Sequence, residues 1–234
     1  MNLLLLSNST LPGQDYLSWP KQYIIDFTQQ LSLQTVFIPY AGVTIEHDSY
    51  TAKVQKALPW LRIEGIHRAT NILESLEQAE LVIVGGGNTF MLYKLLHEEG
   101  LMLPLRERVQ QGLPFIGWSA GSNLACPGLY TTNDMPIAEP PSFAGLNVIP
   151  FQINPHFTDA VLPNHGGETR SQRIAEYLEA QPSKTVVGLV EGALIIVKDG
   201  KYYLKGSEGN KIFRSGVAPQ MLPMGDITNI LTNS

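Results

Sequence analysis

A chain of 234 residues with a formal net charge of −5 is long enough to bury a substantial hydrophobic core. Hydrophobic residues make up 44% and charged residues 16%, which is typical of a globular protein and excludes a disordered one. The acidic balance argues against nucleic acid as a partner, and no hydrophobic run approaches the length of a membrane span.

The first 125 residues alternate short hydrophobic runs with helical patterns. Hydrophobic runs predict strands at Asn2–Leu6, Thr35–Pro39, Leu61–Ile66, Leu81–Val84 and Pro114–Gly117. Helical spacing predicts helices at Leu17–Leu31, Asp48–Leu58, Asn71–Ala79, Thr89–Glu99 and Leu105–Gln111. The first run is too short for a signal peptide and no Lys or Arg precedes it, so we interpret it as a buried strand. This alternation predicts an α/β fold, a mostly parallel sheet flanked by helices on both faces.

The second half of the chain is less regular. Residues 126–167 are rich in proline and have little periodicity, and we expect this irregular segment to form a lid or wall over a functional site. The patterns that follow predict a helix and then four strands, at Glu168–Ala180, Thr185–Val190, Ala193–Val197, Tyr202–Leu204 and Lys211–Arg214. Asp199-Gly200 predicts a C-terminal β-hairpin. We find no repeat and no linker, and we expect residues 1–234 to form a single domain.

The most informative stretch is Gly117-Trp118-Ser119-Ala120-Gly121, directly after a predicted strand. A strand, a G-x-S-x-G pattern and a small-residue segment that can start a helix together predict a nucleophile elbow. Such a turn strains the serine backbone, and the flanking glycines remove side chains that would collide. The same pattern also occurs in tight turns with an incidental serine, so the chain must also supply a base, an acid and an oxyanion hole.

A glycine-rich segment, Gly85-Gly86-Gly87-Asn88, follows another predicted strand and is expected at the same edge of the sheet. Its spacing does not fit a dinucleotide fingerprint, and no P-loop lysine follows it. Glycines at this place let backbone N–H groups approach a ligand oxygen. We expect the N–H groups of Gly87 and Ala120 to form an oxyanion hole, although a close crossing of strand and helix would need glycines too.

Two of the five histidines are candidates for the general base. His156 follows a hydrophobic run within the irregular segment and can reach Ser119 from there. His165 is the competitor and can equally contact the substrate. The sequence has no His and Cys cluster with metal-ligand spacing, so we do not expect a zinc site.

Two carboxylates could orient the base, and spacing alone does not decide between them. Glu191 directly follows a predicted buried strand, which places it at the edge of the sheet where ligands bind. Asp134 lies in the irregular segment, near the elbow in sequence.

The single cysteine, Cys126, is a rival nucleophile. Ser119 holds the elbow position, and we expect Cys126 to be a buried structural residue. One cysteine cannot form a disulfide within the chain, which fits a reducing compartment.

Five segments together closely resemble the peptidase E family of serine peptidases, the alpha-aspartyl dipeptidases. They are Gly85–Thr89, Gly117–Asn123, Thr132–Pro136, Asn154–Phe157 and Asn164–Arg170. The resemblance implies a flavodoxin-like fold similar to the class I glutamine amidotransferase domain. It also implies hydrolysis of dipeptides with an N-terminal aspartate (Asp-X), a cytoplasmic location, and no metal or cofactor.

The resemblance to the family motifs also implies roles for individual residues. Ser119 resembles the nucleophile and His156 the base, while Asp134 and Glu191 both fall in family motifs and both remain candidates for the acid.

Recognition of an aspartate side chain requires a nearby cation, because an unpaired buried carboxylate is costly. Arg170 is our candidate for that cation, and Glu168 is a candidate partner for the substrate ammonium. Both could equally be first-turn residues of a solvated helix. Asn88 and His165 are the other expected substrate contacts.

These observations predict a serine dipeptidase that cleaves Asp-X through an acyl-enzyme on Ser119, as a monomer or small homo-oligomer. The alternatives are a cyanophycinase-like beta-aspartyl peptidase and a non-catalytic ligand-binding module of the same fold. An α/β-hydrolase esterase fits less well, because no clear strand–helix unit separates Asp134 from His156.

Overall fold

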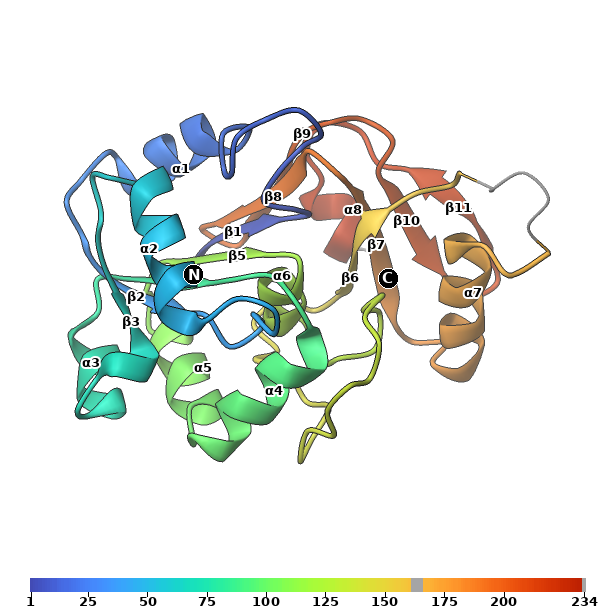
Figure 1. Ribbon diagram of the computed structural model, residues 1–234. Coiled ribbons are helices and arrows are strands. Elements are labelled where there is room, and N and C mark those ends of the chain that lie inside the picture. The colour runs from blue at the N-terminus through green and yellow to red at the C-terminus, as the bar shows by residue number, and fades with distance from the viewer. Residues whose placement is uncertain (161–165, 233–234) are drawn as a thin grey trace.

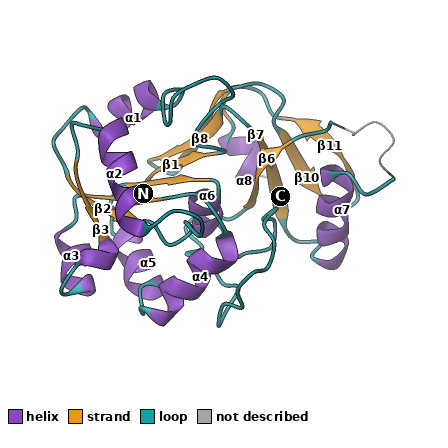
Figure 2. Cartoon of the chain, viewed as in Figure 1, coloured by secondary structure: helices purple, strands orange, loops and turns teal. Residues whose placement is uncertain are grey.

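The computed structural model describes residues 1–160 and 166–232, which form a mixed α/β structure with two sheets (Figures 1 and 2). In spatial order the larger sheet contains β12 (Gly225–Asp226), β9 (Lys201–Gly206), β8 (Ala193–Lys198), β1 (Asn2–Leu6), β5 (Phe115–Trp118), β4 (Leu81–Val84), β2 (Gln34–Ile38) and β3 (Arg62–Gly65). The smaller sheet contains β11 (Val217–Met221), β10 (Lys211–Arg214), β7 (Thr185–Val190) and β6 (Gln152–Phe157).

Helices cover both faces of the larger sheet. One face is covered by α3 (Ile72–Gln78), α4 (Thr89–Glu98), α5 (Met102–Gln110) and α6 (Ala120–Ala125), and the other by α1 (Lys21–Thr28) and α2 (His47–Ala57) (Figure 1). Strand β1 shows why both faces need cover. Leu3 and Leu5 pack into the core on the first face and Leu4 and Leu6 into the core on the second, because successive side chains of a strand point to opposite faces.

The predicted fold class is confirmed. Strands β1, β5, β4, β2 and β3 run parallel, and β8 and β9 extend the sheet antiparallel. The predicted C-terminal hairpin joins β8 to β9 through Asp199 and Gly200, which have φ values of 52° and 76°. Positive φ at both central residues is what a tight two-residue hairpin turn requires.

The smaller sheet was not predicted as a separate layer. Its strand β6 lies inside the segment that we expected to be irregular, and it pairs parallel with β7. Pro155 cannot donate a backbone hydrogen bond, which an edge strand such as β6 tolerates. Helix α7 (Arg170–Ala180) packs on this sheet through Ile174 and Leu178. The chain passes from the smaller to the larger sheet through Glu191 and Gly192.

Some predicted boundaries were wrong. The helix expected at Leu17–Leu31 is only Lys21–Thr28, because Pro20 precedes it and Gln29 and Gln30 adopt φ values of 52° and 54° that end it.

Three short elements complete the described chain, namely the 3₁₀ helix η1 (Ile66–Arg68), α8 (Thr228–Thr232) and the two-residue strand β12.

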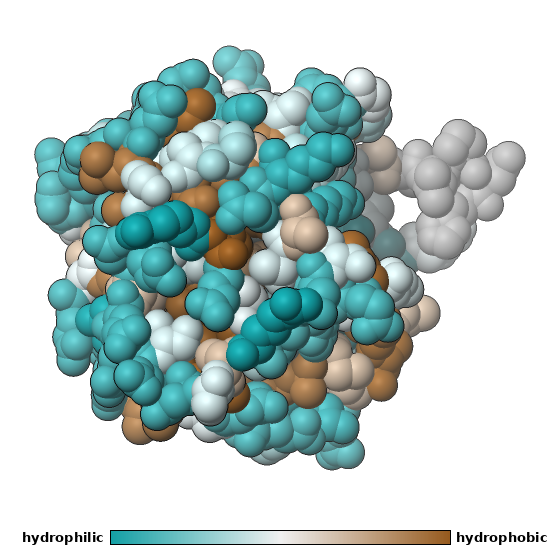
Figure 3. All heavy atoms as spheres, turned by 60° about the vertical axis from the view of Figure 1, so that its left-hand side comes forward, coloured by the Kyte–Doolittle hydropathy of each residue, from teal (hydrophilic) through white to brown (hydrophobic). Residues whose placement is uncertain are grey.

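The surface shown in Figure 3 is largely hydrophilic, with hydrophobic side chains in small groups. Within residues 1–160 and 166–232, no helix has both the length and the hydrophobicity needed to cross a membrane. Met135 is the most exposed of the large hydrophobic residues there, at 75%, and it lies in the segment that borders the candidate site described below.

Candidate active site

Ser119 lies in a strained turn between β5 and α6. Its φ of 54° and ψ of −113° are unfavourable for a residue with a side chain. The Ser119 N–H donates to the carbonyl of Leu6 at 3.1 Å, and the Ser122 hydroxyl donates to the same carbonyl at 2.7 Å. The end of β1 therefore holds the turn in the conformation that the elbow pattern predicts.

The two flanking glycines allow the backbone to approach its neighbours closely. A Cβ on Gly121 would lie 2.2 Å from the Val84 carbonyl oxygen, and a Cβ on Gly117 would lie 2.5 Å from the Gly121 carbonyl oxygen. Both distances are far below van der Waals contact, so neither position accepts a larger residue without backbone movement.

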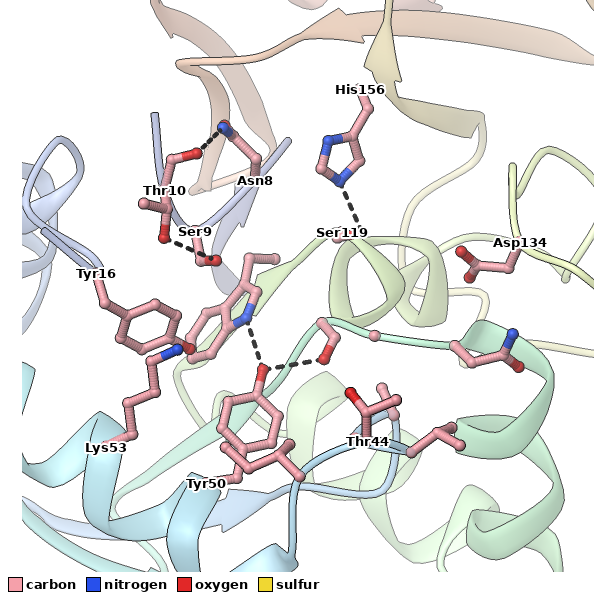
Figure 4. A pocket seen from close by; sticks show the side chains of 18 of the residues that line it. Asn8, Ser9, Thr10, Tyr16, Thr44, Tyr50, Lys53, Ser119, Asp134 and His156 are labelled. Carbon is pink, nitrogen blue, oxygen red and sulfur yellow. Dashed lines mark hydrogen bonds between the residues drawn. The ribbon is translucent and has the colours of Figure 1, made fainter. Parts of the chain in front are cut away.

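The His156 ring lies between Ser119 and Glu191. Its Nε2 is 3.0 Å from Ser119 Oγ (Figure 4), and its Nδ1 is 2.7 Å from Glu191 Oε1. The His156 side chain is 38% exposed and the Glu191 side chain 46%, so water reaches the outer side of this pair. A hydroxyl, an imidazole and a carboxylate in this order have the geometry of an activated nucleophile.

A β-bulge directs His156 toward Ser119. The pairing of β6 with β7 shifts between Pro155 and Phe157, and His156 between them has a φ of 53°. A bulge leaves one residue out of the ladder and can redirect its side chain. Here the His156 N–H donates to Ser7 Oγ at 2.8 Å, and the Ser7 hydroxyl donates to the Leu189 carbonyl at 2.8 Å.

Ser7 and Asn8 are site residues that the sequence analysis did not single out. Both are buried at the carboxyl end of β1. Asn8 Oδ1 accepts the Gly192 N–H at 2.9 Å and so fixes the turn that carries Glu191. The signal that could have identified them is a pair of polar residues directly after a buried parallel strand, where such sheets bind ligands.

Asp134 has different partners. Its Oδ2 accepts the Thr89 N–H at 2.7 Å and the Thr132 hydroxyl at 3.0 Å, and it also accepts the Thr89 hydroxyl. It thereby satisfies an N–H group at the start of α4, where a negative charge is favourable. Of the two candidate acids, the structure brings Glu191 and not Asp134 to His156.

The expected oxyanion donors are the N–H groups of Gly87, in the glycine-rich loop, and of Ala120, at the start of α6. A Cβ on Gly86 would lie 3.1 Å from the Ser119 Cβ, which places the glycine-rich loop against the elbow. Gly87 has a φ of 141°, and a Cβ there would lie 2.0 Å from the Ala41 carbonyl oxygen, so the loop requires glycine. In the described residues neither N–H is bonded to a protein acceptor, and both can bind a ligand oxygen.

Ser119, His156 and Gly87 line a cleft of about 740 Å³. Lys53 and Tyr16 lie on one side of Ser119 and Asp134 on the other (Figure 4). Lys53 is the only Lys or Arg among the described lining residues. Asp134 and Ile137 come from the irregular segment, which forms one wall of the cleft.

Of the four expected substrate contacts, Asn88 lines the cleft, and Arg170 and Glu168 lie elsewhere. Arg170 lines a neighbouring pocket of about 200 Å³, which Asp134 also lines. Partial burial and the charge of Arg173 lower the pKa of Arg170, against the opposing effect of Asp134. Glu168 is exposed, lies 3.9 Å from Arg173 and does not line the cleft. His165 lies outside the described residues.

Cys126 is buried, and its burial raises the pKa of the thiol to about 12. The sulfur accepts the Ile153 N–H at 3.3 Å. A neutral, enclosed thiol is a poor nucleophile, so Cys126 is not a rival to Ser119. Residues 1–160 and 166–232 bring together no group of three or more His, Cys, Asp or Glu side chains that could hold a metal.

The profile of peptidase family S51 matches residues 3–205. Peptidase E of Nostoc sp. is 47% identical over 220 residues, which cover 93% of this chain and 91% of that protein. Peptidase E of Salmonella typhimurium is 48% identical over 229 residues, which cover 96% of this chain and 99% of that protein. These matches confirm the resemblance to peptidase E that the five segments indicated.

Two crystal structures share the fold. One is a peptidase from an acI-B1 actinobacterium, with a TM-score of 0.67 and 15% identity over 95% of this chain and 94% of that one. The other is a Listeria monocytogenes EGD-e protein provisionally assigned to peptidase E, with a TM-score of 0.67 and 23% identity over 88% of this chain and 98% of that one. At these identities the likeness supports the fold alone.

We predict that Gly121→Ala lowers the free energy of unfolding by at least about 2 kcal/mol, because the added methyl group would collide with the Val84 carbonyl behind the elbow. Urea unfolding measures the change. Gly166→Ala is the matched control, since no described residue lies within 4 Å of its Cβ position, and it should change stability by less than about 0.5 kcal/mol. Equal stability of the two variants would show that the close approach at Gly121 is not real.

Proposed function

The chain belongs to peptidase family S51 and is a serine peptidase, and we propose that it is a dipeptidase that removes an N-terminal aspartate from Asp-X dipeptides. The observation that carries the catalytic part of this proposal is the position of His156, 3.0 Å from Ser119 Oγ and 2.7 Å from Glu191 Oε1. The substrate part is supported by the peptidase E motifs and by the relatives of that name.

In the acylation step, Ser119 Oγ attacks the peptide carbonyl carbon while His156 Nε2 accepts the hydroxyl proton. The carbonyl oxygen becomes an oxyanion that binds the N–H groups of Gly87 and Ala120. Each such donor is worth about 3 kcal/mol of transition-state stabilisation. His156 then gives its proton to the departing amine, the C–N bond breaks, and an aspartyl ester remains on Ser119.

In the second step a water molecule replaces the amine. His156 takes a proton from this water, which attacks the ester carbonyl, and the same two N–H groups bind the new oxyanion. The ester bond then breaks, Ser119 regains its proton from His156, and free aspartate leaves.

Glu191 is the carboxylate that we assign to orient His156. By accepting a hydrogen bond from Nδ1–H it keeps the proton on that nitrogen and leaves the Nε2 lone pair facing Ser119. Its negative charge also stabilises the imidazolium that forms during each proton transfer.

The substrate aspartate carries a carboxylate and an ammonium, and we assign a partner to each. Arg170 is half-buried, forms no ion pair with a described carboxylate, and lines the pocket that meets the cleft at Asp134. We therefore keep it as the partner of the carboxylate. Asn88 lines the cleft itself and is a further contact.

For the ammonium, the geometry favours Asp134 over Glu168. Asp134 lines the cleft, and its three hydrogen bonds all reach Oδ2, which leaves Oδ1 without a partner among the described residues. Glu168 is exposed and does not line the cleft.

We further propose that the chain acts as a single catalytic domain in the cytoplasm. The nucleophile lies on the larger sheet, whereas the base and Glu191 lie on or beside the smaller one, so neither sheet carries the site alone. The single buried cysteine fits a reducing compartment.

We predict that Glu191→Gln lowers kcat by about 10²- to 10⁴-fold with little change in KM, because it disturbs the orientation and charge stabilisation of His156. Asp134→Asn should mainly raise KM, by about 10- to 100-fold, because it removes a charged contact to bound substrate. Steady-state kinetics with Asp-Leu measures both variants. If Asp134→Asn lowered kcat more than Glu191→Gln, the two roles would have to be exchanged.

We predict that Arg170→Met lowers kcat/KM for Asp-Leu by about 10²-fold and changes that for Asn-Leu little, because only the first substrate carries the side-chain carboxylate. Lys53→Met is the matched control, since it removes one positive charge on the other side of Ser119. It should preserve the ratio of kcat/KM for Asp-Leu to kcat/KM for Asn-Leu.

The same kinetic panel includes a beta-linked Asp-Arg substrate, which wild type should cleave more slowly than Asp-Leu. If wild type cleaved the beta-linked substrate faster than Asp-Leu, the chain would be a beta-aspartyl peptidase and the proposed substrate class would be wrong. If Arg170→Met left the ratio of kcat/KM for Asp-Leu to kcat/KM for Asn-Leu unchanged, Arg170 would not bind the aspartate side chain.

A further inference from the structure

The oxyanion hole depends on the orientation of one peptide unit, the one that joins Gly86 to Gly87. A trans peptide is planar, so the direction of the Gly86 carbonyl fixes the opposite direction of the Gly87 N–H. The ends of this loop are held by two backbone bonds, from Gly85 N–H to Ile38 O at 3.1 Å and from Asn88 N–H to Ala41 O at 2.8 Å. Glycines resist rotation least, so the central peptide needs a further restraint.

That restraint comes from Tyr50 of α2. Its hydroxyl donates to the Gly86 carbonyl oxygen at 3.0 Å, and the same hydroxyl oxygen accepts the Trp118 indole N–H at 3.1 Å (Figure 4). Because the indole N–H can only donate, it fixes the Tyr50 oxygen as its acceptor and leaves the hydroxyl proton for Gly86. Burial raises the pKa of Tyr50, so the hydroxyl stays protonated.

Packing holds this chain of hydrogen bonds in place. The centroid of the Phe37 ring lies 5.0 Å from that of Tyr50, with the two rings edge to face. It lies 6.1 Å from the Trp118 ring centroid, with the two rings stacked. A Cβ on Gly85 would lie 2.7 Å from the Tyr50 hydroxyl, and a Cβ on Gly86 would lie 2.8 Å from the Trp118 ring. The glycines of this loop therefore do more than approach the substrate, because they also admit the two aromatic side chains.

We propose that Tyr50 is a positioning residue of the oxyanion hole, which holds the Gly86–Gly87 peptide so that the Gly87 N–H faces the developing oxyanion. This inference rests on the proposed role of Ser119 as nucleophile. The hydrogen bond from Tyr50 also draws electron density toward the Gly86 oxygen, which makes the Gly87 N–H a stronger donor. Since Trp118 directly precedes Ser119, the same contacts tie the oxyanion loop to the nucleophile.

Tyr50→Phe removes the hydroxyl and keeps the ring. We expect kcat for Asp-Leu to fall about 10-fold with KM changed less than about threefold, because the lost interaction acts in the transition state. The affinity for an α-aminoboronic acid analogue of aspartate should fall by a similar factor, since its tetrahedral adduct with Ser119 places an oxygen in the same hole.

Tyr93→Phe is the matched control. Tyr93 is also buried and donates to a backbone carbonyl, that of Asn123 at 3.2 Å, but this carbonyl does not belong to a peptide that supplies an oxyanion donor. Both variants should lose similar thermal stability, and only Tyr50→Phe should lose kcat and boronic acid affinity.

The inference is overturned if Tyr50→Phe loses no more kcat and no more boronic acid affinity than Tyr93→Phe, or if it raises KM with kcat unchanged. A wild-type protein that binds the boronic acid but does not hydrolyse Asp-Leu would count against the proposed substrate. In that case the affinities of the two variants would still decide the role of Tyr50.

Discussion

The carboxyl end of β1 is bonded to both sheets, and the geometry of the site depends on these bonds. The Leu6 carbonyl accepts the N–H of Ser119, which belongs to the larger sheet. The Ser7 hydroxyl accepts the N–H of His156, which belongs to the smaller sheet. Three consecutive residues, completed by Asn8, thus set the positions of Ser119, of His156 and of the turn that carries Glu191, which we propose as nucleophile, base and acid.

Both Ser119 and His156 have positive φ values, of 54° and 53°, which are unfavourable for residues with a side chain. Each such residue costs about 1–3 kcal/mol, so surrounding structure has to hold it in place. Leu6 and Ser7 are themselves fully buried, and their hydrogen bonds to Ser119 and His156 contribute to that support. A nucleophile and a base that are both held in strained conformations need little reorganisation when the substrate binds.

How much could be predicted from the sequence depended on the range of the interaction. The elbow at Ser119 could be predicted, because glycine geometry and strand periodicity act within a few residues. The choice of Glu191 over Asp134 could not, since it depends on a bulge at His156 and on the pairing of β6 with β7, which are distant in sequence. For the same reason Ser7 was missed, because its partner lies 149 residues away.

Catalysis as proposed requires Ser119 to be a nucleophile that His156 activates. The most direct measurement is reaction of the folded protein with a fluorophosphonate, followed by peptide mass spectrometry of wild type and His156→Ala. We expect one adduct on Ser119, formed much more slowly in the variant. An unmodified Ser119 in folded, active protein, or an adduct on another residue, would contradict it.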